Sequence, residues 1–176
     1  MTDKETFEEI KREILRRAHV AQACIEQYRR AYESETMAEL CQIIKDNFWW
    51  ACRHQVIDTA LLKQYEPDFA ENDIYVNVSA CKGYLLCDNA TVTADNNAAV
   101  VAYGNATVRA YGNATVGAYD NATVRAYDNA TVRAYDNAYC TSFDKMQVTL
   151  SGNAIYSVRS TDTVYYVSPD LIFVKQ

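Results

Sequence analysis

The sequence predicts a mainly β protein, a parallel β-solenoid of octapeptide units with an α-helical cap region at its N-terminus. Asparagine recurs every eight residues through the middle of the chain, as in the stretch GNATVGAYDNATVRAYDNATV at 112–132. Within each unit, strand alternation puts Ala, Val and Ala on one side and Thr, Arg and Tyr on the other. The first seventy residues instead have apolar side chains at the three-and-four spacing of amphipathic helices.

The helical cap region is expected over residues 1–66. One apolar stripe runs from Phe7 to Tyr28 and a second from Leu40 to Cys52, so we expect two helices there. A shorter third helix is expected from Asp58 to Tyr65, ended by Pro67. The expected N-caps are Thr2, with Glu5 completing a capping box, Thr36, with Glu39 in the same role, and Asp58.

The aromatic run NFWWACRH contains Trp49 and Trp50, two candidate partner-binding residues. It has more apolar surface than a two-helix unit hides alone. We therefore expect part of it to pack against the first coil of the repeat, or to form an aromatic patch that binds a partner.

The alternation also predicts which side of the solenoid is dry. Arg109, Arg125 and Arg133 stand at odd-numbered positions, and unpaired charges are rarely buried, so the even-numbered side chains should point inward. Because the period is even, this parity should hold across the whole expected solenoid, residues 73–176, from Ile74 to Val174.

A two-sided coil of two octapeptides, 16 residues, is favoured over a three-sided coil of 24. Alanine and valine are too small to fill a triangular prism, whereas two sheets pressed together need only small side chains. The large inward residues Tyr84, Met146 and Tyr156 keep the three-sided form open. Each corner is expected at a Gly-Asn or Asp-Asn pair, which tolerates a left-handed backbone, and stacked corners should align the asparagines into a hydrogen-bonded ladder.

Charge and cysteine usage exclude several classes of function. The net charge of −6 comes mostly from residues 1–73, with 15 acidic and 10 basic side chains against 8 and 7 in the rest. Direct nucleic-acid binding is therefore unlikely. With no secretory signal or membrane span recognised, we expect a cytoplasmic protein whose six cysteines are thiols. Four of them, at apolar positions, are expected to be structural: Cys24, Cys41, Cys52 and Cys140.

No catalytic machinery is recognisable, so we expect a protein that is not an enzyme and holds no cofactor or metal. His19 and His54 lack a nucleophile or acid at a recognisable spacing. Calcium-binding β-rolls use several oxygen ligands per turn, whereas a turn here offers one carboxylate or none. The candidate partner-binding residues are instead outward side chains of the repeat, expected as one or two tyrosine rows beside arginines: Tyr103, Tyr111, Tyr119, Tyr127, Tyr135, Arg109, Arg125 and Arg133.

The AYGNATV and AYDNATV units, preceded by the segment DNFWWACRHQVIDTALLKQY, resemble a group of uncharacterised bacterial and phage proteins with AYxNATV repeats. The resemblance implies the context of a gut bacterium or its mobile elements, and it implies no activity.

We expect a non-catalytic interaction module, a rigid solenoid that binds a protein partner; an inhibitor of a host defence enzyme, encoded by a phage or mobile element, is one form of it. The alternative is a purely structural protein whose solenoids join end to end through the segment DLIFVKQ, since an apolar terminal strand invites pairing. For that reason a homodimer is also expected.

Overall fold

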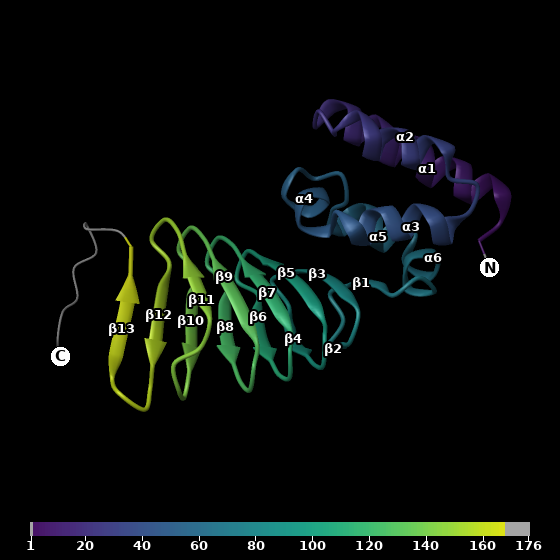
Figure 1. The fold of residues 1–176 in the computed structure, drawn as a ribbon. Helices are drawn as coiled ribbons and strands as arrows, with labels where there is room; N and C mark the ends of the chain where they lie inside the picture. The colour runs from purple at the N-terminus through teal and green to yellow at the C-terminus, as the bar shows by residue number, and fades with distance from the viewer. Residues whose placement is uncertain (1, 168–176) are drawn as a thin grey trace. The chain divides into compact units, whose positions relative to one another are not determined.

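The computed structural model describes residues 2–167 and divides the chain into two compact units, Met1–Val76 and Asn77–Gln176 (Figure 1). The first unit contains six helices and one short strand; the second contains strands only. Among the described residues, no helix has both the length and the apolar character needed to cross a membrane. The two units are described separately below.

The first unit has six helices where the apolar stripes predicted three. The first stripe is divided at Gln22, whose φ of 56° is left-handed, and the second at Asn47, which caps one helix and begins the next. The prediction of one helix per stripe is therefore wrong. The elements are α1 (Lys4–Val20), α2 (Ile25–Glu33), α3 (Met37–Asp46), α4 (Phe48–Arg53), α5 (Thr59–Gln64), α6 (Glu66–Ala70) and β1 (Ile74–Val76).

Two of the three expected N-caps are confirmed. Thr36 Oγ1 accepts from the Glu39 amide at 3.2 Å, and Asp58 Oδ1 accepts from the Leu61 amide at 2.7 Å. The Thr2 capping box is wrong by one residue, because Asp3 caps α1 through the amide of Thr6 at 3.0 Å. Pro67 lies in the first turn of α6, where its missing N–H costs nothing.

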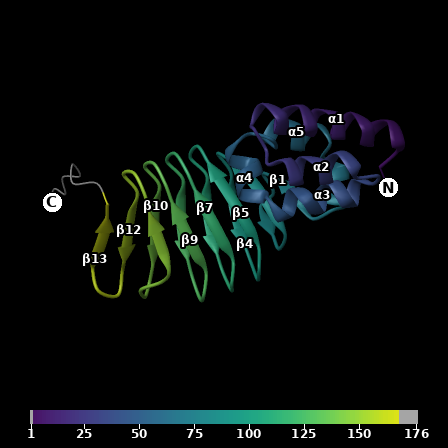
Figure 2. The same cartoon turned by 45° about the horizontal axis from the view of Figure 1, so that its top comes forward.

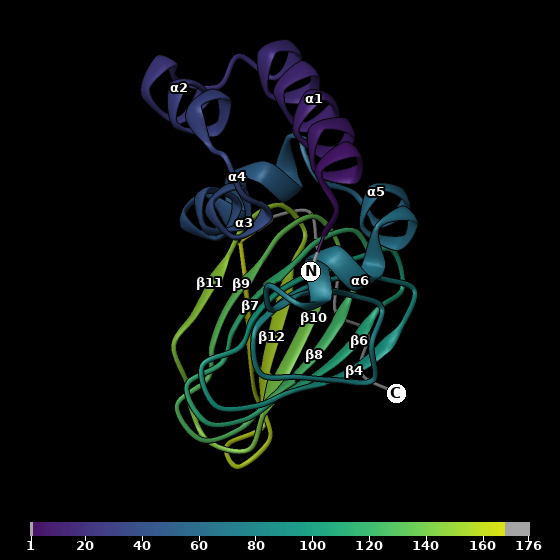
Figure 3. The same cartoon turned by 90° about the vertical axis from the view of Figure 1, so that its right-hand side faces the viewer.

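The second unit is a parallel β-solenoid of two facing sheets, as predicted. Odd-numbered strands form sheet A and even-numbered strands form sheet B, so the chain changes sheet at every corner (Figures 2 and 3). Sheet A contains β3 (Tyr84–Asp88), β5 (Ala99–Tyr103), β7 (Thr115–Ala118), β9 (Thr131–Ala134) and β11 (Val148–Leu150). Sheet B contains β2 (Ala80–Cys81), β4 (Thr91–Ala94), β6 (Thr107–Ala110), β8 (Thr123–Ala126), β10 (Tyr139–Ser142) and β12 (Ile155–Val158), and ends with β13 (Thr163–Tyr166).

The register confirms the two-sided coil. Val108 on β6 pairs with Val124 on β8, and Val116 on β7 pairs with Val132 on β9, each 16 residues apart. The even-numbered side chains between the sheets are buried, with 0% exposure at all four valines. Valine and alanine fill the space because the two sheets are the only walls of the coil.

The parity fails at both ends of the solenoid. Leu85, Cys87 and Val101 are odd-numbered and yet buried on β3 and β5, where the later strands carry polar side chains. At the other end, Val164 and Tyr166 are even-numbered and yet exposed, by 41% and 49%. The expected core residues Ile172 and Val174 lie outside the described residues.

The exposed end arises because β13 reverses direction. β12 pairs with β13 in an antiparallel register, Val158 opposite Thr163, so the chain makes a hairpin on sheet B instead of crossing to sheet A. Asp162, with a φ of 48°, lies in the hairpin turn. The prediction that the coil continues unchanged through Val164 and Tyr166 is therefore wrong.

Tyr156, which kept the wider coil open as an alternative, fits inside the two-sided coil. Its hydroxyl lies 2.7 Å from Ser142 Oγ and accepts from the Met146 amide at 2.8 Å. Ser142, which interrupts the apolar pattern, is thus the polar partner of an inward tyrosine, and a local network takes the place of a wider cross-section.

The corners confirm the expected turn and the expected ladder. The residue before asparagine is left-handed whether it is glycine or aspartate, with φ of 61° at Gly112 and 53° at Asp128. Asparagine amides bond along the stack at 16-residue intervals, as from Asn153 Nδ2 to Asn137 Oδ1 at 3.2 Å.

The corner aspartates add a bond that the repeat alone did not predict. Asp128 Oδ2 accepts from the backbone amide of Gly112, one coil earlier, at 3.0 Å. Asp120 accepts in the same way from Gly104 at 2.9 Å. These carboxylates therefore satisfy backbone donors of the neighbouring coil.

Candidate interaction face of the solenoid

The outward tyrosines form two stacked columns, one at each corner edge of the solenoid. Along the corner that follows sheet A, the ring centroids of Tyr103 and Tyr119 are 5.0 Å apart and those of Tyr119 and Tyr135 are 4.7 Å apart. Along the corner that follows sheet B, Tyr111 and Tyr127 stack at 4.6 Å with an interplanar angle of 5°. Each ring is half-buried by its neighbours, so the columns stabilise the stack as well as presenting an aromatic surface.

The three candidate arginines are exposed, as predicted, but they do not share one face. Arg109 and Arg125 are register partners on β6 and β8 of sheet B, whereas Arg133 lies on β9 of sheet A opposite Gly117. None of the three forms an ion pair with another described residue. Sheet B therefore presents two stacked guanidinium groups without a counter-ion.

Two aromatic residues that the sequence reasoning did not select extend this face of sheet B. Phe143 follows Tyr127 by 16 residues and is 61% exposed. Tyr139 precedes it on β10 and is 41% exposed. The spacing of 16 was the signal that could have found Phe143, because it continues the positions of Tyr111 and Tyr127. The arginine pair, the Tyr111–Tyr127 stack, Tyr139 and Phe143 are called the sheet B face below.

Trp49 and Trp50 belong to the helical unit and are half-buried on α4. The Trp49 ring meets Phe48 edge-on, with centroids 5.9 Å apart, and the Trp50 ring stacks on His54 at 4.9 Å. These contacts give both indoles a packing role within the helical unit. They also place His54 against an aromatic ring and not beside a nucleophile.

The cysteines have the environment of structural thiols, with one exception. Burial raises the pKa of the Cys41, Cys87 and Cys140 thiols to about 12 and raises the pKa of Cys52 still further. Cys24 is exposed, so its expected place in the helical core is wrong. The reason is the break at Gln22, which removes Cys24 from the α1 stripe and places it at the start of α2.

We expect a thiol reagent at pH 8 to modify about one cysteine in the folded protein and all six after denaturation, because only the thiolate reacts. Mass spectrometry after brief labelling measures the stoichiometry, and rapid modification of Cys87 or Cys140 would contradict the buried positions. The same shifts predict a pH effect. Folded thiols stay protonated while unfolded ones ionise near pH 9, so the free energy of unfolding should fall as the pH rises above about 9.

Residues 2–167 contain no group of three His, Cys, Asp or Glu side chains placed to hold a metal ion. What the second unit offers chemically is a repeated outer surface of aromatic rings, hydroxyls and guanidinium groups. Such side chains bind other molecules through stacking, hydrogen bonds and charge.

No family model, no curated protein and no solved structure matches the chain.

Proposed function

We propose that the protein is a non-catalytic interaction module and that its solenoid binds an acidic surface of a protein partner through the sheet B face. The observation that carries this proposal is the register pairing of Arg109 with Arg125, two guanidinium groups on neighbouring strands without an acidic partner among the described residues. The aligned Tyr111–Tyr127 stack lies along the corner of the same sheet.

The arginine pair is unfavourable for the isolated protein. Adjacent strands lie about 4.8 Å apart, and like charges directly opposite each other destabilise a sheet by about 0.2–1 kcal/mol. The same column holds Thr93 and Thr141 on the flanking strands, so a neutral side chain fits there. A carboxylate-bearing partner would remove the repulsion and accept bidentate hydrogen bonds from both arginines.

The aromatic residues supply the apolar part of the proposed interface. Tyrosine and arginine dominate the energetics of many protein interfaces, because a rigid ring buries a large area at little entropic cost. Tyr111 and Tyr127 are already ordered by stacking, so binding would immobilise few additional torsions. Phe143 and Tyr139 continue the surface toward β12.

The test uses Arg125→Thr and its matched control Arg133→Thr in the full chain. Both remove one exposed positive charge from the same position of the octapeptide, on opposite sheets. We expect a partner captured from a lysate of the source organism to bind Arg125→Thr about tenfold more weakly than Arg133→Thr, with an affinity that falls as salt is added.

The same pair of variants predicts opposite directions for stability and binding. Arg125→Thr relieves the repulsion with Arg109, so its free energy of unfolding should rise by about 0.5 kcal/mol in urea. Arg133 faces Gly117 across the strand pair, and Arg133→Thr should leave stability nearly unchanged. Equal partner affinity of the two variants would overturn the proposed use of the sheet B face.

A structural role is the second candidate, in which solenoids join at the β13 end. Val164, Tyr166 and Val167 are exposed there by 41%, 49% and 56%. The segment DLIFVKQ, on which the expectation of pairing was based, lies outside the described residues. Analytical ultracentrifugation separates the candidates, since end-to-end assembly requires a mass above the monomer at micromolar concentration and a monomer would remove it along with the expected homodimer.

A further inference from the structure

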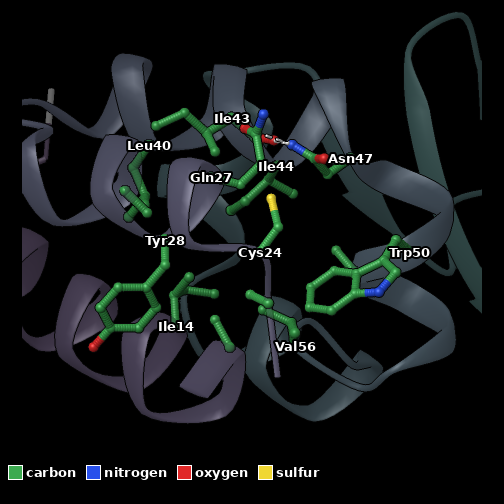
Figure 4. Close-up of a pocket in the computed structure, with 14 residues that line it drawn as sticks. Ile14, Cys24, Gln27, Tyr28, Leu40, Ile43, Ile44, Asn47, Trp50 and Val56 are labelled. Atoms are coloured by element: carbon green, nitrogen blue, oxygen red, sulfur yellow. Dashed lines mark hydrogen bonds between the residues drawn. The ribbon is translucent and has the colours of Figure 1, made fainter. Parts of the chain in front are cut away.

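The helical unit contains an apolar cavity of about 200 Å³ between α1, α2, α3 and α4 (Figure 4). Its floor is made of side chains that are almost fully buried: Ile14, Ala18, Leu40, Ile44, Ala51 and Val56. Trp50 and Tyr28 line it with aromatic rings (Figure 4). The solenoid contributes none of these residues, so this cavity is independent of the sheet B face.

The space exists because small side chains line it where larger ones would close it. Ala31 is the one fully buried residue of α2, while Ile25 and Tyr32 of the same helix are exposed by 88% and 66%. Helix α2 thus lies over the cavity without filling it. An occupant would give α2 the apolar contacts that its own sequence does not supply.

A polar edge interrupts the apolar lining. Asn47 Nδ2 donates to Gln27 Oε1 at 3.2 Å, the dashed line in Figure 4, and to the Ile43 carbonyl at 2.9 Å. Arg30 also donates to Gln27 Oε1, at 2.9 Å. These bonds use the amide nitrogen of Asn47 and the amide oxygen of Gln27. The Gln27 Nε2 donor and the Asn47 Oδ1 acceptor make no hydrogen bond with other described residues.

The volume sets the size of the ligand. A dry protein cavity of about 150 Å³ accommodates benzene, whereas pockets for drug-sized molecules start near 300 Å³. A cavity of about 200 Å³ therefore suits a molecule of one ring with a short substituent. A hydroxyl group on that molecule could donate to Asn47 Oδ1 and accept from Gln27 Nε2 at once.

We propose that this cavity binds a small molecule with a single-ring apolar body and one hydroxyl-like polar group, with the body against Ile14, Leu40 and Trp50 and the polar group at the Gln27–Asn47 edge. The proposal does not depend on the function proposed for the solenoid, and it requires no chemical step.

The experiment titrates 4-ethylphenol into the full chain and follows the Trp50 indole N–H signal by NMR, assigned with Trp49→Phe. We expect saturable shifts in the wild type and at least tenfold weaker binding to Ala31→Leu, which fills the cavity. Ala38→Leu, the same change at an exposed residue of α3, should bind like the wild type. If Ala31→Leu fails to fold, Ala23→Leu fills the cavity from the half-buried connection before α2.

Ethylbenzene, which lacks the hydroxyl, is the second probe. Losing one or two neutral hydrogen bonds should weaken binding by about three- to tenfold. Equal affinity for the two probes would overturn the role given to Gln27 and Asn47. The absence of a saturable shift, or equal shifts in Ala31→Leu and the wild type, would overturn the cavity as a binding site.

Discussion

Replacing Val124 with aspartate should lower the free energy of unfolding of the solenoid by at least about 4 kcal/mol, because it buries an unpaired carboxylate between two sheets. Val124 is fully buried on β8, with Val108 and Cys140 as its register partners on either side. None of these neighbours can neutralise or hydrogen-bond a charge. Urea denaturation followed by circular dichroism measures the effect.

The control for Val124→Asp is Arg125→Asp, the same new side chain one residue further along the strand. Arg125 points outward opposite Arg109, so an aspartate there meets a positive charge and remains solvated. We expect Arg125→Asp to be at least as stable as the wild type. If both variants lost the same stability, the assignment of even-numbered residues to the core would fail.

Replacing Gly112 with valine has the second-largest expected effect, a loss of about 3 kcal/mol. Gly112 has a φ of 61°, where a β-branched residue is strained by about 1–3 kcal/mol. A Cβ atom would also lie 3.1 Å from the Asn96 Cα atom, in backbone that cannot easily move. Urea denaturation of the full chain measures the loss.

Gly112→Asp is the matched comparison, since aspartate occupies the equivalent corner at Asp128 with a φ of 53°. Its cost should be about 1 kcal/mol or less, because a short polar side chain tolerates the left-handed region. A valine variant as stable as the aspartate variant would show that the backbone of this corner is not held in that region.

The period of the repeat predicted most of the solenoid because an even period ties each side chain to one side of a strand. Val108, Val116 and Val124 could be assigned to the interior without knowing how many octapeptides make a coil. The small volume of Ala and Val then selected two sheets. Neither argument reaches β13, where the short hairpin around Asp162 reverses the chain while the alternation of the sequence continues unbroken.

The helical unit was less predictable because its divisions depend on the backbone of single residues. The apolar stripe continues from Ile14 to Ile25 and Tyr28, yet a left-handed Gln22 separates α1 from α2 and leaves Ile25 exposed. The cavity under α2 had no signal in the spacing, since it results from how four helices pack around alanines. It could be found only in three dimensions.

The candidate face was half predicted. Tyrosine columns and exposed arginines follow from parity, but which residues share a face depends on the number of octapeptides per coil. With two per coil, Arg109 joins Arg125 and is separated from Arg133. A three-sided coil would have aligned residues 24 apart, and then Arg109 and Arg133 would have been neighbours.

The alternation of sheets at every corner makes the surface sensitive to a change that the interior does not register. Inserting a single octapeptide between Arg125 and Arg133 would add one strand to sheet A and shift every later strand to the opposite sheet. Alanine and valine would still meet alanine and valine inside, whereas Arg133 would join Arg109 and Arg125 in a continuous row of three. Duplication of eight codons is thus enough to redraw the outer charge pattern of this protein while its packing is preserved.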